Sequence, residues 1–210
     1  MKKLESSLIN MVLVLVGVAL IMGGILAWVN HITEGPIAKQ AEQALANGIK
    51  EVMGGEKLTV MNNDTVIQNI DGKEAIFIIH HTQNRQKNYV GAAVESSALG
   101  FSDNLKVLVG FNPEGEILGY TILQSSETPG LGAKADKWFQ EGQKGDIIGK
   151  NLSDKLLSVK KDGGDIDAIT ASTITSRAFL KAINQAYQAY TKKDVDGQSG
   201  ATQLQKVAKR

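Results

Sequence analysis

The chain has 210 residues, and its 23 lysines and arginines nearly balance its 22 aspartates and glutamates, which gives a formal net charge of +1. It contains no continuous basic stripe with interleaved aromatic residues, which argues against a nucleic-acid partner. It also contains no cysteine, so disulfides, thiolate nucleophiles and cysteine-ligated iron–sulfur or zinc sites are excluded. Its three histidines show no ligand spacing, so we expect no metal site. Redox chemistry here would therefore need a bound organic cofactor.

An apolar run near the N-terminus, residues 11–29, reads MVLVLVGVALIMGGILAWV and carries no charged side chain. A helix of this length spans a hydrocarbon core of about 30 Å, so the run predicts a transmembrane helix in a lipid bilayer. Lys2 and Lys3 precede the run, and the next lysine is Lys39, a bias that places the N-terminus in the cytoplasm and the rest outside it. The length of the run favours a retained anchor over a cleaved signal peptide.

The remaining chain is long enough for one medium-sized domain. Residues 37–52 have apolar side chains at helical spacing and predict a stalk helix that leads into this domain. The segments that we expect are a cytoplasmic N-terminus (1–10), a transmembrane helix (11–29), a stalk helix or linker (30–55), one extracytoplasmic domain (56–190) and a polar flexible tail (191–210).

Short segments rich in β-forming residues follow the stalk, each bounded by Gly, Asn or Asp, and they predict an antiparallel sheet. These segments are Leu58–Met61, Ala75–His80, Tyr89–Val94, Leu105–Phe111 and Ile117–Leu123. Asn112-Pro113-Glu114-Gly115 predicts a tight hairpin turn between the last two, because proline presets φ and glycine accepts positive φ. Helical spacing predicts a short helix over Asp136–Gln140 and an amphipathic helix over Ser176–Tyr190. The expected fold class is α+β, with helices flanking the sheet.

A hydroxyl-rich segment, Asp167–Ser176, leads directly into the last predicted helix and reads DAITASTITS. The first turn of a helix has unpaired N–H groups and the positive end of the dipole, so a phosphate would be stabilised here without a dedicated lysine. A phosphate linked covalently to a threonine would fit equally well. The alternative is that Thr175 or Ser176 is an N-cap and that the other hydroxyl groups belong to an ordinary loop.

The hydroxyl-rich segment resembles the flavinylation motif of the FMN-binding domain found in RnfG, a component of Rnf complexes, and in NqrC, a component of sodium-pumping NADH:quinone reductase. That motif has an Asp, two variable residues, a Ser or Thr, usually Gly, Ala, and then the Thr that receives FMN through a phosphoester bond. Asp167, Thr170 and Thr173 match it, whereas Ala171 stands where Gly is usual and Ser172 where Ala is usual. The resemblance therefore implies Thr173 as the attachment point.

The predicted tail contains a second copy of the motif, residues 196–202, which matches more literally and ends at Thr202. No comparable helical apolar pattern follows Thr202, and the tail lacks the bulk to shelter a flavin ring. We therefore expect Thr173 as the acceptor and keep Thr202 as a possible second or adventitious site.

Glu127–Gly132 resembles the ETPGLG signature of the same family, which is expected near the flavin. Pro129 would stiffen the turn, while Gly130 and Gly132 would let backbone donors approach a flat ring. Glu127 or Thr128 could hydrogen-bond the ring or cap the turn. The cofactor-binding residues that the resemblance implies are Thr173, Asp167, Thr170, Ser172, Thr175, Ser176, Glu127, Thr128, Gly130, Leu131 and Gly132.

The resemblance to the RnfG family implies an electron-carrying subunit with covalent FMN in a complex that couples ferredoxin and NAD redox chemistry to Na⁺ or H⁺ translocation. It implies partner membrane and peripheral subunits, a flavin transferase for maturation, and anchoring in a bacterial or archaeal cytoplasmic membrane. We expect no catalytic residue and no independent turnover. The ion path would belong to the partners, since the predicted span has no ionisable residue. Two alternatives stay open, namely NqrC of the quinone reductase and an anchored binding module without a cofactor.

Overall fold

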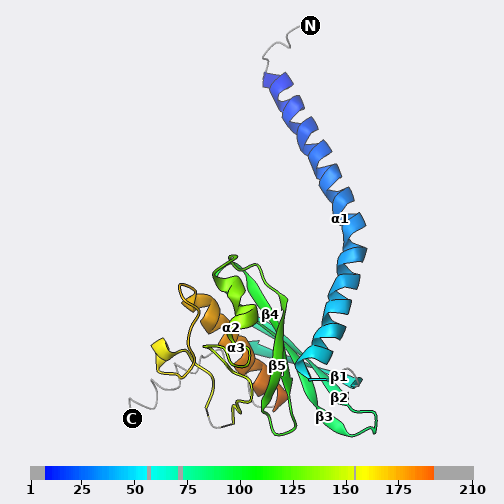
Figure 1. The fold of residues 1–210 in the computed structure, drawn as a ribbon. Helices are drawn as coiled ribbons and strands as arrows, with labels where there is room; N and C mark the ends of the chain where they lie inside the picture. Colours follow the sequence, from blue (N-terminus) through cyan, green and yellow to red (C-terminus); the bar gives the residue numbers. More distant parts are fainter. Residues whose placement is uncertain (1–7, 56–57, 71–72, 154, 192–210) are drawn as a thin grey trace. The chain divides into compact units, whose positions relative to one another are not determined.

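The computed structural model describes residues 8–55, 58–70, 73–153 and 155–191, and the chain divides into two compact units, residues 1–44 and 45–210. The second motif around Thr202 and the predicted tail beyond Thr191 lie outside the described residues. Helix α1 runs from Leu8 to Val52 and supplies the described part of the first unit (Figure 1). Among the described residues, α1 is the one helix long and apolar enough to cross a membrane.

The apolar side chains of α1 are exposed along the predicted span, as Leu13, Leu20 and Leu26 illustrate at 64–71% exposure. In water, each exposed side chain of this kind forgoes about 1.5–3 kcal/mol of burial free energy. A lipid environment removes that cost, so the exposure is what a membrane-spanning segment requires. The predicted border between span and stalk stays a prediction, because one continuous helix passes through both and includes Pro36.

The second unit contains a five-stranded antiparallel sheet in which each strand pairs with its neighbour in sequence. The strands are β1 Thr59–Ile70, β2 Lys73–Gln83, β3 Tyr89–Leu99, β4 Asn104–Phe111 and β5 Ile117–Gln124. The helical elements are η1 Gly132–Lys134, α2 Ala135–Trp138, η2 Lys160–Asp162 and α3 Thr173–Tyr190. The predicted α+β fold is confirmed, and so is the hairpin turn, where the Gly115 N–H donates to the Asn112 carbonyl at 3.0 Å.

Several elements are longer or begin elsewhere than the sequence predicted. Strand β1 continues to Ile70 through an Asn- and Asp-rich stretch, because it pairs with β2 along its whole length and this pairing outweighs weak β-propensity. Helix α3 begins at Thr173 instead of Ser176, and the Ser176 N–H donates to the Ser172 carbonyl at 3.0 Å. The short helix predicted over Asp136–Gln140 lies at Ala135–Trp138, a shift within the usual uncertainty of helix ends.

Helix α3 covers one face of the sheet and carries the main core. Phe179 of α3 is fully buried, stacks on Phe139 with ring centroids 4.4 Å apart, and meets Tyr120 edge-on at 4.8 Å. The Tyr120 hydroxyl donates to the Ala135 carbonyl at 2.7 Å. Burial raises the pKa of Tyr120 above its ordinary value, so this donor stays protonated. These contacts fix α2, and with it the ETPGLG segment just before it, relative to α3.

The last turns of α1 pack on the opposite face of the sheet, where Ile49 and Val52 join Ala93 and Leu108 in a second cluster. The approach is close enough that a Cβ added at Gly110 would overlap the carbonyl oxygen of Val52. The end of α1 therefore belongs to the packed second unit, and its backbone lies directly on β4.

We predict that Gly110→Ala lowers the free energy of unfolding by about 1–3 kcal/mol, because the added methyl group must push the backbone of α1 away from the sheet. Gly35→Ala is the matched control, since a Cβ there would have no neighbour within 4 Å. Urea unfolding of the full chain in detergent measures both variants. Equal stability of Gly110→Ala and the wild type would contradict the close packing.

Candidate functional site

A buried carboxylate connects the ETPGLG segment to two other parts of the chain. Glu127 is 7% exposed, and its Oε1 accepts a hydrogen bond from the Phe101 N–H at 2.7 Å. Its Oε2 accepts one from the Thr175 hydroxyl at 2.8 Å. Glu127 thereby joins the β3–β4 turn, its own loop and the first turn of α3. Both oxygens accept hydrogen bonds from donors of this chain, which indicates that Glu127 holds these three parts together.

The glycines around Glu127 make this packing possible. A Cβ at Gly132 would come within 2.7 Å of the Thr175 Oγ1, and one at Gly100 would overlap the Glu127 Oε1. Gly132 thus allows the close contact between its loop and α3. The sequence had predicted that this glycine would let backbone donors approach a flat ring. Gly130 is exposed and has φ of +76°, which only a glycine adopts without strain. It allows the turn in which the Leu131 N–H donates to the Thr128 carbonyl at 3.1 Å.

A pocket of about 340 Å³ opens where these three parts meet, and we call it the Thr173 pocket. Its lining residues are Phe101, Glu127, Thr128, Leu131, Ala171, Ser172, Thr173, Ile174 and Thr175. Three of its large apolar side chains are unusually exposed, namely Phe101 at 67%, Ile174 at 52% and Leu131 at 40%. Apolar walls beside several hydroxyl groups suit a flat aromatic ligand with a polar end.

The structure brings only some of the expected residues into this pocket. Those that line it are Glu127, Thr128, Leu131, Ser172, Thr173 and Thr175, whereas Asp167, Thr170, Ser176, Gly130 and Gly132 do not. Ser176 is fully buried, where its hydroxyl donates to the Ser172 carbonyl and accepts from the Ile169 N–H, both at 2.9 Å. Thr170 is exposed. Ser176 therefore shapes the loop before α3 from inside the protein.

The sequence did not assign Phe101, Ala171 or Ile174 to the site. Phe101 comes to the site through the long-range hydrogen bond from its N–H to Glu127. Ala171 has φ of +61°, a left-handed conformation that costs an ordinary residue about 1–2 kcal/mol. The motif usually has Gly at this position, and the observed φ gives the physical reason for that preference.

Thr173 is the first residue of α3, is half-buried, and has a lysine beside its hydroxyl. The Lys161 ammonium donates to the Thr173 Oγ1 at 3.3 Å. From the sequence, we expect that a phosphate could be held here without a dedicated lysine, and that stays a prediction. The structure adds Lys161, which turn η2 brings to the helix start. The preceding residue, Lys160, pairs with the motif carboxylate of Asp167 at 2.8 Å.

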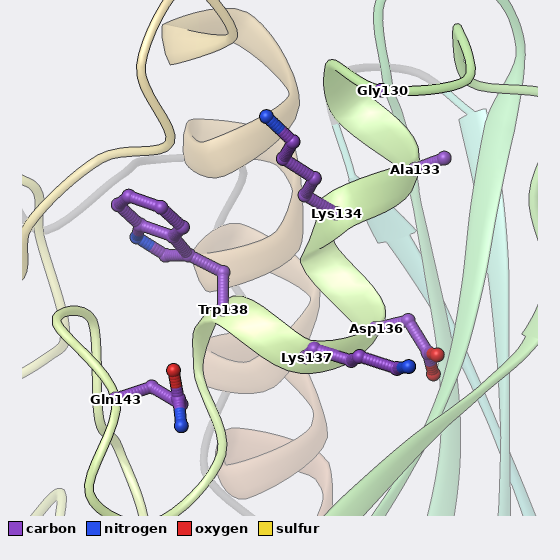
Figure 2. A pocket seen from close by; sticks show the side chains of 7 residues that line it. All are labelled: Gly130, Ala133, Lys134, Asp136, Lys137, Trp138 and Gln143. Atoms are coloured by element: carbon purple, nitrogen blue, oxygen red, sulfur yellow. The ribbon is translucent and has the colours of Figure 1, made fainter.

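A second pocket, of about 370 Å³, lies around η1 and α2, and Figure 2 shows its lining residues. Lys134 and Trp138 extend from the same side of this segment (Figure 2). The Trp138 indole N–H donates to the Asp167 carbonyl at 2.8 Å, which ties α2 to the loop leading to Thr173. Among the described residues, no group of three or more His, Asp or Glu side chains is placed to hold a metal ion.

Curated relatives resemble the chain over most of its length. It is 34% identical over 180 residues to the G subunit of the ion-translocating oxidoreductase complex of Shewanella baltica, covering 80% of this chain and 82% of the relative. It is 33% identical over 174 residues to the protein of the same name from Yersinia pestis, covering 78% and 80%. The chain belongs to the RnfG family of ion-translocating oxidoreductase complexes. The family resemblance drawn from Asp167–Thr173 and Glu127–Gly132 is thus confirmed.

Two family models match separate parts of this RnfG-family chain. Residues 1–52 match the RnfG N-terminal region, and residues 100–188 match the FMN-binding domain. All residues of the Thr173 pocket fall within the second match, whereas Thr202 lies outside it. The crystal structure of the C subunit of Na⁺-translocating NADH-quinone reductase from Parabacteroides distasonis aligns with a TM-score of 0.41 at 17% identity, covering 63% of this chain and 77% of that one.

Proposed function

We propose that this chain is the electron-transfer subunit of an ion-translocating ferredoxin:NAD oxidoreductase complex, and that it carries FMN through a phosphoester on Thr173. The observation that carries the proposal is the position of Thr173, at the start of α3 and in the wall of the Thr173 pocket. It places a hydroxyl group, the positive end of a helix and an apolar recess at one point. The match of residues 100–188 to the FMN-binding domain supports it.

The surroundings of Thr173 fit the phosphate end of FMN. The first turn of α3 presents backbone N–H groups that lack helical partners, and the helix dipole favours an anion there. Ser172 occupies the N-cap position but makes no side-chain cap hydrogen bond. The hydroxyl-rich loop is therefore not explained as a side-chain cap, which weakens the alternative of a binding module without a cofactor.

The walls of the Thr173 pocket fit the ring end of FMN. Phe101, Leu131 and Ile174 present apolar surface to solvent that a bound isoalloxazine would cover, at a gain of about 25 cal/mol per Å². The hydroxyl groups of Thr128 and Ser172 lie in the same lining and would face its polar edge. When bound, FMN supplies one- and two-electron redox chemistry, while the protein supplies position and electrostatics.

The remaining expected properties belong to the same proposal. The chain would carry electrons within the complex and would have no independent turnover. The apolar part of α1 would lie in the bilayer of a cytoplasmic membrane, with the second unit on the extracytoplasmic side. Electrons would pass to and from other membrane and peripheral subunits. A flavin transferase would attach the FMN.

The experiment is to produce the full chain with an FAD-dependent flavin transferase, purify it in detergent and denature it before electrophoresis. We expect flavin fluorescence to remain with the protein band. A band without fluorescence, next to a flavinylated control protein from the same host, would overturn the covalent attachment. Protein that is yellow before denaturation and colourless afterwards would indicate FMN bound without a covalent bond.

A further inference from the structure

Turn η2 makes three successive contacts with the segment that carries Thr173. Lys160 pairs with Asp167 at 2.8 Å, and Lys161 donates to the Thr173 Oγ1 at 3.3 Å. Asp162 accepts two hydrogen bonds from Arg177, at 2.6 and 2.7 Å. Consecutive residues of one short turn thus contact the motif acid, the proposed acceptor and the second turn of α3.

The position of Lys161 is fixed by its neighbours. Arg177 holds the pKa of the Asp162 carboxyl below its usual range, so the Asp162–Arg177 pair is ionised at neutral pH. The backbone of the turn is held by the Lys160 N–H, which donates to the Ile166 carbonyl at 2.9 Å. A Cβ at Gly164 would overlap the Ser158 carbonyl, so the two segments that flank η2 pack without space between them. The backbone that carries Lys161 is therefore held by hydrogen bonds and close packing on both sides of it.

Two of the three basic side chains at η2 and the start of α3 are in ion pairs. The Lys160 charge is offset by Asp167, and the Arg177 charge by Asp162. Lys161 makes no ion pair with any described residue, and its hydrogen bond in the described structure is to Thr173. The Lys161 ammonium thus lies at the Thr173 hydroxyl without an ion-pair partner among the described residues, although its charge also acts on the neighbouring Asp162 and lowers the pKa of that carboxyl.

We propose that Lys161 is the counter-charge of the phosphodiester on Thr173, a step that rests on the proposed function. A phosphate esterified to both the flavin ribityl chain and Thr173 keeps one negative charge, which matches the single unpaired ammonium. A charge-assisted hydrogen bond from Lys161 to a phosphate oxygen replaces its weaker bond to a neutral hydroxyl. Lys161 is thus a binding residue for the phosphate and takes no part in electron transfer.

The test compares Lys161→Gln and Lys161→Arg with Lys155→Gln, in the full chain flavinylated by the transferase. Lys155 is the matched control, because it is an exposed lysine whose partner, Asp165, is also exposed. The readout is the ³¹P NMR signal of the phosphodiester. We expect Lys161→Gln to shift this signal, and Lys155→Gln and Lys161→Arg to leave it close to the wild-type position. The initial rate of flavinylation should fall about two- to fivefold in Lys161→Gln, as expected for one partly exposed charge pair.

The outcomes separate this inference from the proposed function. A phosphodiester signal that is identical in the wild type and Lys161→Gln would overturn the role of Lys161 and leave the attachment intact. Equal shifts in Lys161→Gln and Lys155→Gln would also overturn it, because a general loss of charge would then suffice. Absence of a phosphodiester signal from the wild type would instead overturn the proposed function.

Discussion

A Thr173→Ala protein will carry no flavin after denaturation, whereas the wild type made alongside it will be flavinylated. The substitution removes the hydroxyl oxygen that the phosphoester requires, so the expected effect is complete loss of the adduct and not a partial decrease. Thr173 is half-buried, and within the described part of the chain its hydroxyl is hydrogen-bonded to the exposed Lys161, so the fold should survive the change. Intact-mass analysis of the denatured protein measures the result.

Ser172→Ala is the matched control for this prediction. It removes the neighbouring hydroxyl group, which makes no side-chain cap hydrogen bond, and it introduces the residue that the motif usually has there. Ser172→Ala should therefore be flavinylated like the wild type. Full flavinylation of Thr173→Ala would contradict the assignment and would point to Thr202 as the acceptor.

Glu95→Ala should lower the free energy of unfolding by about 1–3 kcal/mol, the range for leaving a buried hydrogen-bonding group without its partner. Glu95 is 4% exposed, and its two oxygens lie 2.7 Å from the His80 Nε2 and 2.6 Å from the Lys106 Nζ. The His80 Nδ1 lies 2.9 Å from the Asn63 Oδ1. The change would leave a buried imidazole without its carboxylate partner in the middle of the sheet.

Asp165→Ala is the control for the loss of an ion pair, because the Lys155–Asp165 pair is exposed and should contribute less than about 1 kcal/mol. Urea unfolding of both variants in detergent gives the comparison. If Glu95→Ala loses no more stability than Asp165→Ala, the prediction that the buried carboxylate stabilises the fold more than the exposed pair is contradicted.

The stabilisation by Glu95 should also depend on pH. Burial raises the pKa of this carboxyl, but the hydrogen bonds from His80 and Lys106 lower it more, so its pKa in the folded protein lies below 4.5. A lowered folded pKa means that the stabilisation is complete above the unfolded pKa and is lost as the pH falls through the folded value. The wild type should therefore lose more stability than Glu95→Gln between about pH 5 and 3. Equal losses of stability in the wild type and Glu95→Gln over this pH range would contradict the pH dependence assigned to Glu95.

Local patterns in the sequence were sufficient for much of the fold. The hairpin at Asn112–Gly115, the main parts of β2 to β5 and the start of β1 were predicted, because their turn residues and alternation are short-range signals. The extension of β1 to Ile70 was not predicted, since it depends on pairing with β2 and not on β-propensity. The start of α3 at Thr173 was also missed, because Ser172 has the N-cap position without the side-chain bond that a cap usually makes.

The residues of the candidate site also fall into those that local motifs predicted and those that they did not. Thr173, Glu127 and Leu131 were predicted because each lies in a contiguous motif, and the structure brings all three to one pocket. Phe101, which lines the pocket, and Lys161, which donates to the Thr173 hydroxyl, were not predicted, because both come to the site through contacts between separate parts of the chain. No local spacing encodes such contacts. Phe101 is held at the site by the Glu127 carboxylate, and Lys161 is brought to Thr173 by turn η2.

The attachment of FMN to Thr173 is tested most directly by peptide mapping of the wild-type chain, made with the flavin transferase and digested with trypsin. Cleavage after Lys161 and Arg177 would release residues 162–177, and cleavage after Lys193 and Lys206 would release residues 194–206 with Thr202. We expect an FMN-sized adduct on the first peptide, with fragment ions that place it on Thr173. An adduct on the second peptide alone, or none when a control flavoprotein is modified, would contradict the account.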